Sequence, residues 1–242
     1  MNNKWLEVFQ RNRVNLNHPA SSEAAIRLGK DVLSYREELL NYFLAIDKNK
    51  LVMGHFKCTR ATREHYQNSW HFVTLIREPI NRWYSHYYFD RFREKNLHYK
   101  KTDLDLATYL SSEEGLQNAR LYTRHFSGFV NNRDEINWAY AEEAADNVLN
   151  FNVYGVLDDL DTFSKKYESV IGTKLKIPYK NKNPKKNYRK ENISEELRRR
   201  VEDFCKYDKF IYDKVKESIK LGSSSKHTNL QAQVNSPQKA TN

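Results

Sequence analysis

The sequence predicts an α/β fold with a mainly parallel central sheet flanked by helices. Three short apolar runs, rich in β-branched and aromatic residues, have the length of buried strands: residues 51–53, 71–76 and 151–157. Helical patterns separate these runs, and strands that alternate with helices are typical of a parallel sheet. The chain of 242 residues, 39% of them hydrophobic, is long enough to bury a core of this kind.

Helical periodicity covers most of the remaining chain. We expect residues 1–48 to form a helical N-terminal segment, with a break near residue 20 and a second helix, capped by Ser21 or Ser22, that ends near residue 47. Residues 49–220 are predicted to form the α/β domain. The Ser-, Asn- and Gln-rich residues 221–242 are predicted to be a disordered tail. The expected later helices cover residues 79–95, 104–110, 113–126, 138–149, 159–170 and 194–220.

Composition excludes several classes of protein. The seven glycines lie at least 13 residues apart, so the glycine-rich dinucleotide fingerprint and the Walker A loop are both absent. Two cysteines, Cys58 and Cys205, cannot form a disulfide framework. No apolar run approaches the roughly 18 residues that a membrane helix needs, and the N-terminus lacks a secretory signal. We therefore expect no membrane span and a cytoplasmic, soluble chain; the alternative is a Golgi-lumen or membrane-anchored protein whose true N-terminus is missing.

The charge balance indicates an anionic partner. The net charge is +10, and residues 174–190 carry eight basic side chains and no acidic one. Such a block fits a polyanionic sugar, a phosphorylated cofactor, nucleic acid or a membrane surface, and equally a solvated charge run. We expect no nucleic-acid partner, because no nucleic-acid-binding motif is present.

Residues 73–89 carry the clearest site signal. Val73 and Ile76 are expected to be buried in a strand that ends at Arg77, and Pro79 follows at a position typical of the first residue of a helix. Arg77 then lies at the carboxyl edge of the sheet, where α/β proteins bind ligands, and Ser85 follows two helical turns later. A guanidinium, a hydroxyl and a helix N-terminus are suited to bind phosphate. The alternative is an ordinary strand–helix unit with a surface arginine.

This stretch resembles the 3′-phosphate-binding motif of the carbohydrate sulfotransferases that use 3′-phosphoadenosine 5′-phosphosulfate (PAPS), most closely the heparan sulfate 2-O-sulfotransferase branch. The resemblance implies a P-loop-like three-layer sandwich in which Arg77 and Ser85 hold the 3′-phosphate of PAPS, with no metal. The aromatic run that follows is also similar to that branch, and we expect Arg91 within it to contact the substrate.

Upstream, the Gly54–His55 pair at the end of a predicted strand resembles the segment that carries the family's proposed general base. The resemblance implies that His55 takes the proton from the acceptor sugar hydroxyl, a role that suits imidazole with its pKa of about 6.5. The alternative is a histidine that closes a strand and is hydrogen-bonded in a turn.

Two downstream segments extend the resemblance, which covers about residues 51–214. Residues 121–128 are similar to a segment that shapes the acceptor side, and this makes Arg124 a second expected substrate contact. Residues 182–190 occupy the position of a basic loop that closes over the nucleotide, which implies cofactor contacts from Tyr188, Arg189 and Lys190.

The chain departs from the family in one respect. Members normally begin with a strand and a Lys-Thr-Gly-Gly-Thr-like loop that holds the 5′-phosphosulfate, and we find no match before Leu51. The predicted function is transfer of a sulfuryl group from PAPS to a saccharide hydroxyl, with weak or absent activity in the chain as given. The alternative is a catalytically inactive protein of the same fold that binds nucleotides or polyanionic glycans.

Overall fold

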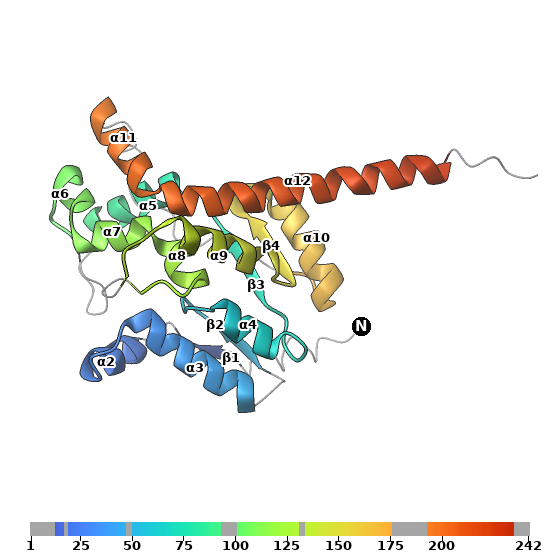
Figure 1. Cartoon of the computed structure of the whole chain (residues 1–242), viewed down its shortest axis with the longest axis horizontal. Helices are drawn as coiled ribbons and strands as arrows, with labels where there is room; N and C mark the ends of the chain where they lie inside the picture. Colours follow the sequence, from blue (N-terminus) through green and yellow to red (C-terminus); the bar gives the residue numbers. More distant parts are fainter. Residues whose placement is uncertain are drawn as a thin grey trace, which may run out of the picture.

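The computed structural model describes residues 13–16, 19–46, 50–92, 101–130, 134–175 and 193–234, with side chains up to residue 222. Within these residues the chain is a mixed α/β protein in which helices surround two small parallel sheets (Figure 1). Among the helices described, none combines the length and apolar composition that crossing a membrane requires.

Each sheet consists of two parallel strands. Strand β1 (Arg13–Asn15) pairs with β2 (Leu51–Met53), and β3 (Val73–Ile76) pairs with β4 (Val153–Val156). The three strands predicted from the sequence are therefore confirmed, as is an α/β fold with parallel pairing. The expected central sheet is not seen: the described strands form two separate pairs, because β2 pairs with β1 and β3 pairs with β4. Ile76 is buried as expected, whereas Val73 is exposed, because it starts a four-residue strand and faces outward there.

The N-terminal segment differs from the prediction. It contains β1 in addition to two helices, α2 (Pro19–Arg27) and α3 (Val32–Ile46). The helix expected to run from residue 22 to residue 47 is interrupted at Gly29, whose φ of 63° lies in the left-handed region that favours glycine. A three-residue strand has too few residues to show a period, and only its pairing with β2 reveals it.

The N-terminal segment is also part of the main core. Leu16, Leu40 and Leu44 belong to the same buried cluster as Ile76 and Val156. Strands β1 and β2 pair with each other across the expected boundary near residue 48.

The remaining helices mostly follow the predicted pattern, with splits at Arg120 and Cys205 and an unpredicted helix after β2. They are α4 (Arg60–Tyr66), α5 (Pro79–Phe92), α6 (Leu106–Leu110), α7 (Glu113–Ala119), α8 (Leu121–Phe126), α9 (Trp138–Leu149), α10 (Leu160–Ile171), α11 (Glu195–Phe204) and α12 (Lys206–Val234), with a 3-10 turn η1 (Leu157–Asp159) before α10.

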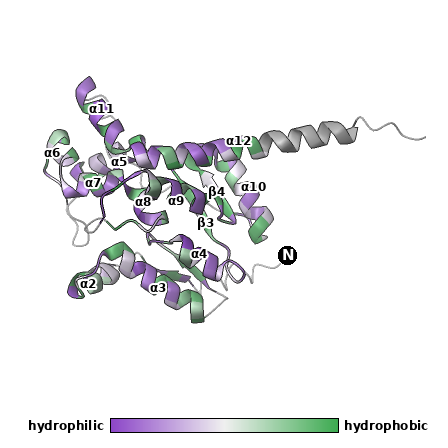
Figure 2. Cartoon of the chain, viewed as in Figure 1, coloured by the Kyte–Doolittle hydropathy of each residue, from purple (hydrophilic) through white to green (hydrophobic). Residues whose placement is uncertain are grey.

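Helix α12 extends into the expected disordered tail. Its first half packs on the core through Ile211, Tyr212 and Val215, and the helix continues past Gly222 to Val234, beyond the rest of the molecule (Figure 1). Residues 221–234, which the sequence predicts to be part of a disordered tail, thus continue α12 in the structure. Once packing has formed the first turns, adding further turns to a helix costs little free energy. Hydrophilic and hydrophobic residues alternate along the described part of α12 (Figure 2).

A second buried cluster fixes α5, the helix that carries Ser85. Trp83, Tyr87 and Tyr88 pack with Tyr109 of α6, and the Trp83 indole N–H donates to the Gly115 carbonyl oxygen (3.0 Å). These aromatic anchors set the rotation of α5 and therefore the direction in which its other faces point.

We predict that Gly155→Ala in β4 destabilises the fold by about 1–3 kcal/mol, the usual cost of overpacking. A Cβ at this position would lie 2.9 Å from Cβ and 2.7 Å from Cδ2 of Phe163, which joins α10 to the strand. Urea unfolding measures the loss. Gly222→Ala is the control, because nothing lies within 4 Å of the added carbon, and equal stability of the two variants would contradict this packing.

Candidate functional site

Arg77 directly follows β3, and a tyrosine from α8 holds its backbone. The Arg77 N–H donates to the Tyr122 hydroxyl oxygen (2.7 Å), and the Tyr122 hydroxyl donates to the Arg77 carbonyl oxygen (2.6 Å). The Arg77 side chain is half-buried, and within the described part of the chain its guanidinium makes no hydrogen bond or ion pair. The backbone is therefore fixed while the positive charge stays available for an anion.

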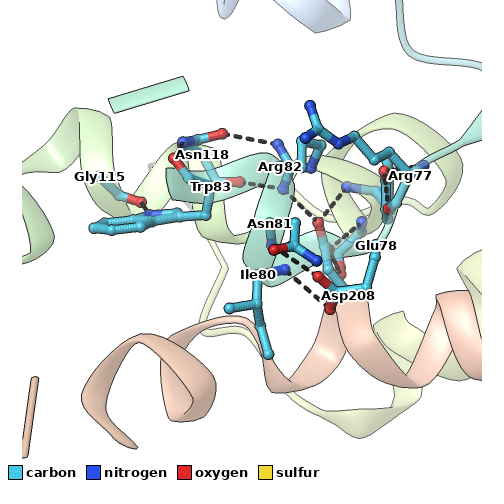
Figure 3. Close-up of polar contacts among 11 residues, drawn as sticks. Arg77, Glu78, Ile80, Asn81, Arg82, Trp83, Gly115, Asn118 and Asp208 are labelled. Carbon is cyan, nitrogen blue, oxygen red and sulfur yellow. Dashed lines mark hydrogen bonds and ion pairs between the residues drawn. The ribbon is translucent and has the colours of Figure 1, made fainter. Parts of the chain in front are cut away.

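Ser85 lies two turns into α5, which begins at Pro79 as predicted. The serine is half-buried, and its hydroxyl has no hydrogen-bond partner among the described residues. The N-terminus of α5 differs from the expectation, because the Glu78 carboxylate accepts from the N–H groups of Ile80 (3.2 Å) and Asn81 (2.7 Å) (Figure 3). These two amides are already bonded, so the predicted phosphate receptor retains Arg77 and Ser85 without them.

His55 follows β2 after a glycine. Gly54 has a φ of 143°, which favours glycine and turns the chain after the strand. The His55 carbonyl oxygen accepts from Arg36 Nη1 (3.0 Å), and the ring reaches the surface. Desolvation, followed by the positive charges of Arg36 and His86, lowers the pKa of His55 below 6.5. The imidazole is therefore neutral at physiological pH, which is the state a general base requires.

Helix α8 connects the ends of β2 and β3. Tyr122 binds the backbone of Arg77, and one turn later His125 donates from Nδ1 to the Phe56 carbonyl oxygen (2.7 Å). Because both contacts come from one short helix, His55 and Arg77 lie at the same end of the fold. The structure thus brings the expected base and the expected phosphate ligand to one region.

A buried carboxylate from α12 holds α8 in place. Asp208 is fully buried and accepts from the N–H groups of Tyr122 (2.8 Å) and Thr123 (3.0 Å) and from Arg82 Nη2 (3.3 Å). Arg82 also donates to both oxygens of Asn118 on α7 (Figure 3). Burial raises the pKa of Asp208, and the Arg82 charge and the amide donors oppose that shift.

Arg36 is a second buried cation beside the site. Its guanidinium donates to Ser21 Oγ (2.9 Å), Ser22 Oγ (2.9 Å) and the His55 carbonyl oxygen, all of them neutral acceptors. No described carboxylate forms an ion pair with it, and desolvation lowers its pKa. Arg36 therefore joins α3, the first turns of α2 and the end of β2, and its positive charge has no carboxylate partner among the described residues.

The two predicted substrate arginines have other contacts. Arg124 is largely buried on α8 with its Nη2 3.6 Å from the Asp31 carboxylate, and desolvation lowers its pKa while Asp31 opposes this. Arg91 Nη1 donates to the Leu104 carbonyl oxygen (2.6 Å) beyond the end of α5. Each arginine thus has a local partner, and their contact with a substrate stays a prediction.

The predicted cofactor contacts Tyr188, Arg189 and Lys190 lie outside the described residues. Among the described residues, one group of side chains has the composition and spacing of metal ligands. His86, Asp90 and Glu114 each offer one ligand atom, and these three atoms lie within 4.8 Å of one another. Within this group His86 Nδ1 lies 3.0 Å from Asp90 Oδ2, a contact that is an ion pair only when His86 is protonated.

Sequence reasoning missed Arg36 and the role of Asp208. A signal for Arg36 existed, because it shares the buried face of α3 with Leu33, Leu40 and Leu44 at helical spacing. A charged residue within an apolar stripe needs buried partners. Asp208 lies more than 80 residues from the amides that it binds, and no local pattern indicates such a contact.

Comparisons with known proteins identify no relative. No protein-family model matches the chain. No curated protein and no solved structure matches it either.

We predict that Asp208→Asn lowers the free energy of unfolding by about 3 kcal/mol or more, because it leaves the Arg82 charge buried without its carboxylate. Urea unfolding midpoints measure this loss. Asp213→Asn on the same helix is the control, since Asp213 is exposed and pairs with Lys209 at the surface, and its change should stay below about 0.5 kcal/mol. Similar losses for both variants would contradict the role of Asp208.

His125 gives a prediction on pH dependence. Burial, followed by the charge of His55, lowers the pKa of His125 from 6.5 to about 3, so the unfolded chain takes up a proton that the folded protein rejects. The contribution of His125 to the free energy of unfolding therefore decreases as the pH falls below 6.5. Between pH 7 and pH 5 the decrease is about 2 kcal/mol. His125→Gln should lose this part of the pH dependence, measured by unfolding at both pH values. His71→Gln, at an exposed position, should retain it; an unchanged pH dependence in His125→Gln contradicts the assignment.

Proposed function

We propose that the chain is a PAPS-dependent sulfotransferase that acts on a saccharide hydroxyl. One observation carries this proposal: the guanidinium of Arg77 at the end of β3 lies at the same end of the fold as His55, with the hydroxyl of Ser85 on the following helix, and neither group has a partner among the described residues. The resemblance of residues 73–89 to the 3′-phosphate motif of carbohydrate sulfotransferases gives this arrangement its chemical meaning.

Arg77 and Ser85 fit the 3′-phosphate of the cofactor. A guanidinium and a hydroxyl provide charged and neutral donors to phosphate oxygens, and neither group has a competing partner among the described residues. Because Tyr122 fixes the Arg77 backbone on both its N–H and its carbonyl oxygen, binding costs little further backbone entropy.

Arg36 supports a second anion position near the start of α2. Strand β1, parallel to β2 and followed by α2, supplies a strand–turn–helix unit ahead of β2, which fits the P-loop-like three-layer sandwich included in this proposal. The unit lacks the family's glycines and lysine. The uncompensated charge of Arg36 beside Ser21 and Ser22 offers a positive potential there for the 5′-phosphosulfate end of PAPS.

His55 would act as the general base. PAPS supplies a sulfuryl group whose bond to the 5′-phosphate oxygen breaks as a bond to the acceptor oxygen forms, and the phosphate oxygen keeps the electron pair. The acceptor hydroxyl proton passes to His55. The lowered pKa of His55 keeps the ring neutral before this step.

The acceptor saccharide would bind beside His55. Arg124 and Arg91 remain the proposed substrate contacts, and the net charge of +10 favours a polyanionic saccharide. The alternative function is a catalytically inactive protein that binds nucleotides or polyanionic glycans. It is favoured by the absence of a Lys-Thr-Gly-Gly-Thr-like loop in the sequence before β2, and it predicts binding of 3′-phosphoadenosine 5′-phosphate (PAP) without turnover of PAPS.

Calorimetric titration with PAP tests the proposal. Arg77→Ala should weaken PAP binding about 10- to 150-fold, the range for loss of a hydrogen bond to a charged group, and Ser85→Ala should weaken it only a few-fold. Arg60→Ala is the matched control, because Arg60 is exposed and pairs with Glu64 on α4. Equal PAP affinity of the wild type and Arg77→Ala, or no PAP binding at all, would overturn the proposal.

A further inference from the structure

His125 on α8 is held by two hydrogen bonds to the chain that follows β2. Its Nδ1 lies 2.7 Å from the Phe56 carbonyl oxygen, and its own carbonyl oxygen accepts from the Cys58 N–H (2.8 Å). A carbonyl oxygen can only accept, so Nδ1 carries the proton of the neutral ring. The other nitrogen, Nε2, therefore has a free lone pair.

This lone pair is unused. His125 Nε2 is buried and has no hydrogen-bond partner in the described part of the chain. A buried acceptor without a donor costs about 1–3 kcal/mol. Burial and the nearby charges of His55, Arg124 and Arg82 also keep the ring from taking up a proton itself. His125 is therefore a fixed, neutral acceptor that lacks a donor.

The ring of His55 is the neighbouring donor. The two imidazole rings lie edge to face, with centroids 6.2 Å apart and an interplanar angle of 80°. The His55 ring is exposed and makes no hydrogen bond with a described residue, so it is free to turn about its side-chain bonds. Its backbone stays in place through the bond from Arg36.

We propose that His125 is a positioning residue for His55, with its Nε2 accepting a hydrogen bond from a ring N–H of His55 in both the neutral and the protonated form of that ring. The bond orients one His55 nitrogen toward His125, so that the other nitrogen points away from His125. When His55 removes the acceptor proton, the imidazolium that forms keeps one N–H on His125 while the new N–H holds the transferred proton. This inference rests on the proposed function only for the use of the pair in catalysis.

The charged groups around the pair oppose protonation of His55. Arg36 from α3 and His86 from α5 face His55, and Arg124 from α8 and Arg82 from α5 face His125. All of these groups are basic and disfavour a second positive charge. The hydrogen bond to His125 Nε2, a neutral acceptor, is the contact that favours the protonated form of His55. Removing that acceptor should therefore make His55 harder to protonate.

Nitrogen-detected NMR of the full chain near pH 5 tests the pair directly. In the wild type we expect a coupling across the hydrogen bond between a His55 nitrogen and His125 Nε2. This measurement needs no variant, and the absence of the coupling in protein with His55 protonated overturns the inference.

Variants test the same contact through the titration of His55. His125→Phe should lower the pKa of His55 by about 1, and His125→Gln, which keeps an acceptor oxygen, should restore most of it. His71→Gln is the control and should leave the His55 titration unchanged. An unchanged His55 titration in a folded His125→Phe protein overturns the inference; if that variant does not fold, the wild-type coupling decides.

The readouts separate this inference from the proposed function. Failure to bind PAP would remove the sulfotransferase proposal and leave the histidine pair standing. If PAP binds but the pKa of His55 is the same in the wild type and in His125→Phe, only the proposed hydrogen bond between His55 and His125 is rejected.

Discussion

The buried carboxylate of Asp208 is the constraint on which the site depends. By accepting from the first amides of α8, it satisfies donors that a six-residue helix leaves without partners and fixes that helix against α12. Helix α8 in turn holds Arg77 through Tyr122 and the segment after His55 through His125. A contact far from both strands therefore sets the relative position of the expected phosphate ligand and the expected base.

Positive charge without a matching carboxylate distinguishes this end of the fold. Arg82 has Asp208 and Arg124 has Asp31, but Arg36 and Arg77 have no acidic partner among the described residues. Removing a guanidinium from water costs several kcal/mol, and neutral acceptors offset only part of that cost for Arg36. An anionic ligand would compensate the positive charges of Arg36 and Arg77. The proposed binding of phosphate and sulfate groups rests on this charge balance.

The sequence predicted the parts of the fold that have a local signal. The strands at 51–53, 73–76 and 153–156 and the start of α5 at Pro79 follow from apolar runs and proline position. Strand β1 was missed because three residues show no period. The capping of α5 by Glu78 was missed because the sequence does not show whether the first N–H groups of a helix bind a neighbouring carboxylate or a phosphate. Asp208 binds amides remote in sequence. Very short elements and long-range contacts limited the prediction.

The position of the 3′-phosphate in a crystal structure of the PAP complex tests the account most directly. The account predicts one phosphate oxygen within hydrogen-bond distance of the Arg77 guanidinium and another near the Ser85 hydroxyl, with His55 on the same side of the fold. A 3′-phosphate bound elsewhere, with Arg77 and Ser85 left without a ligand contact, would contradict it.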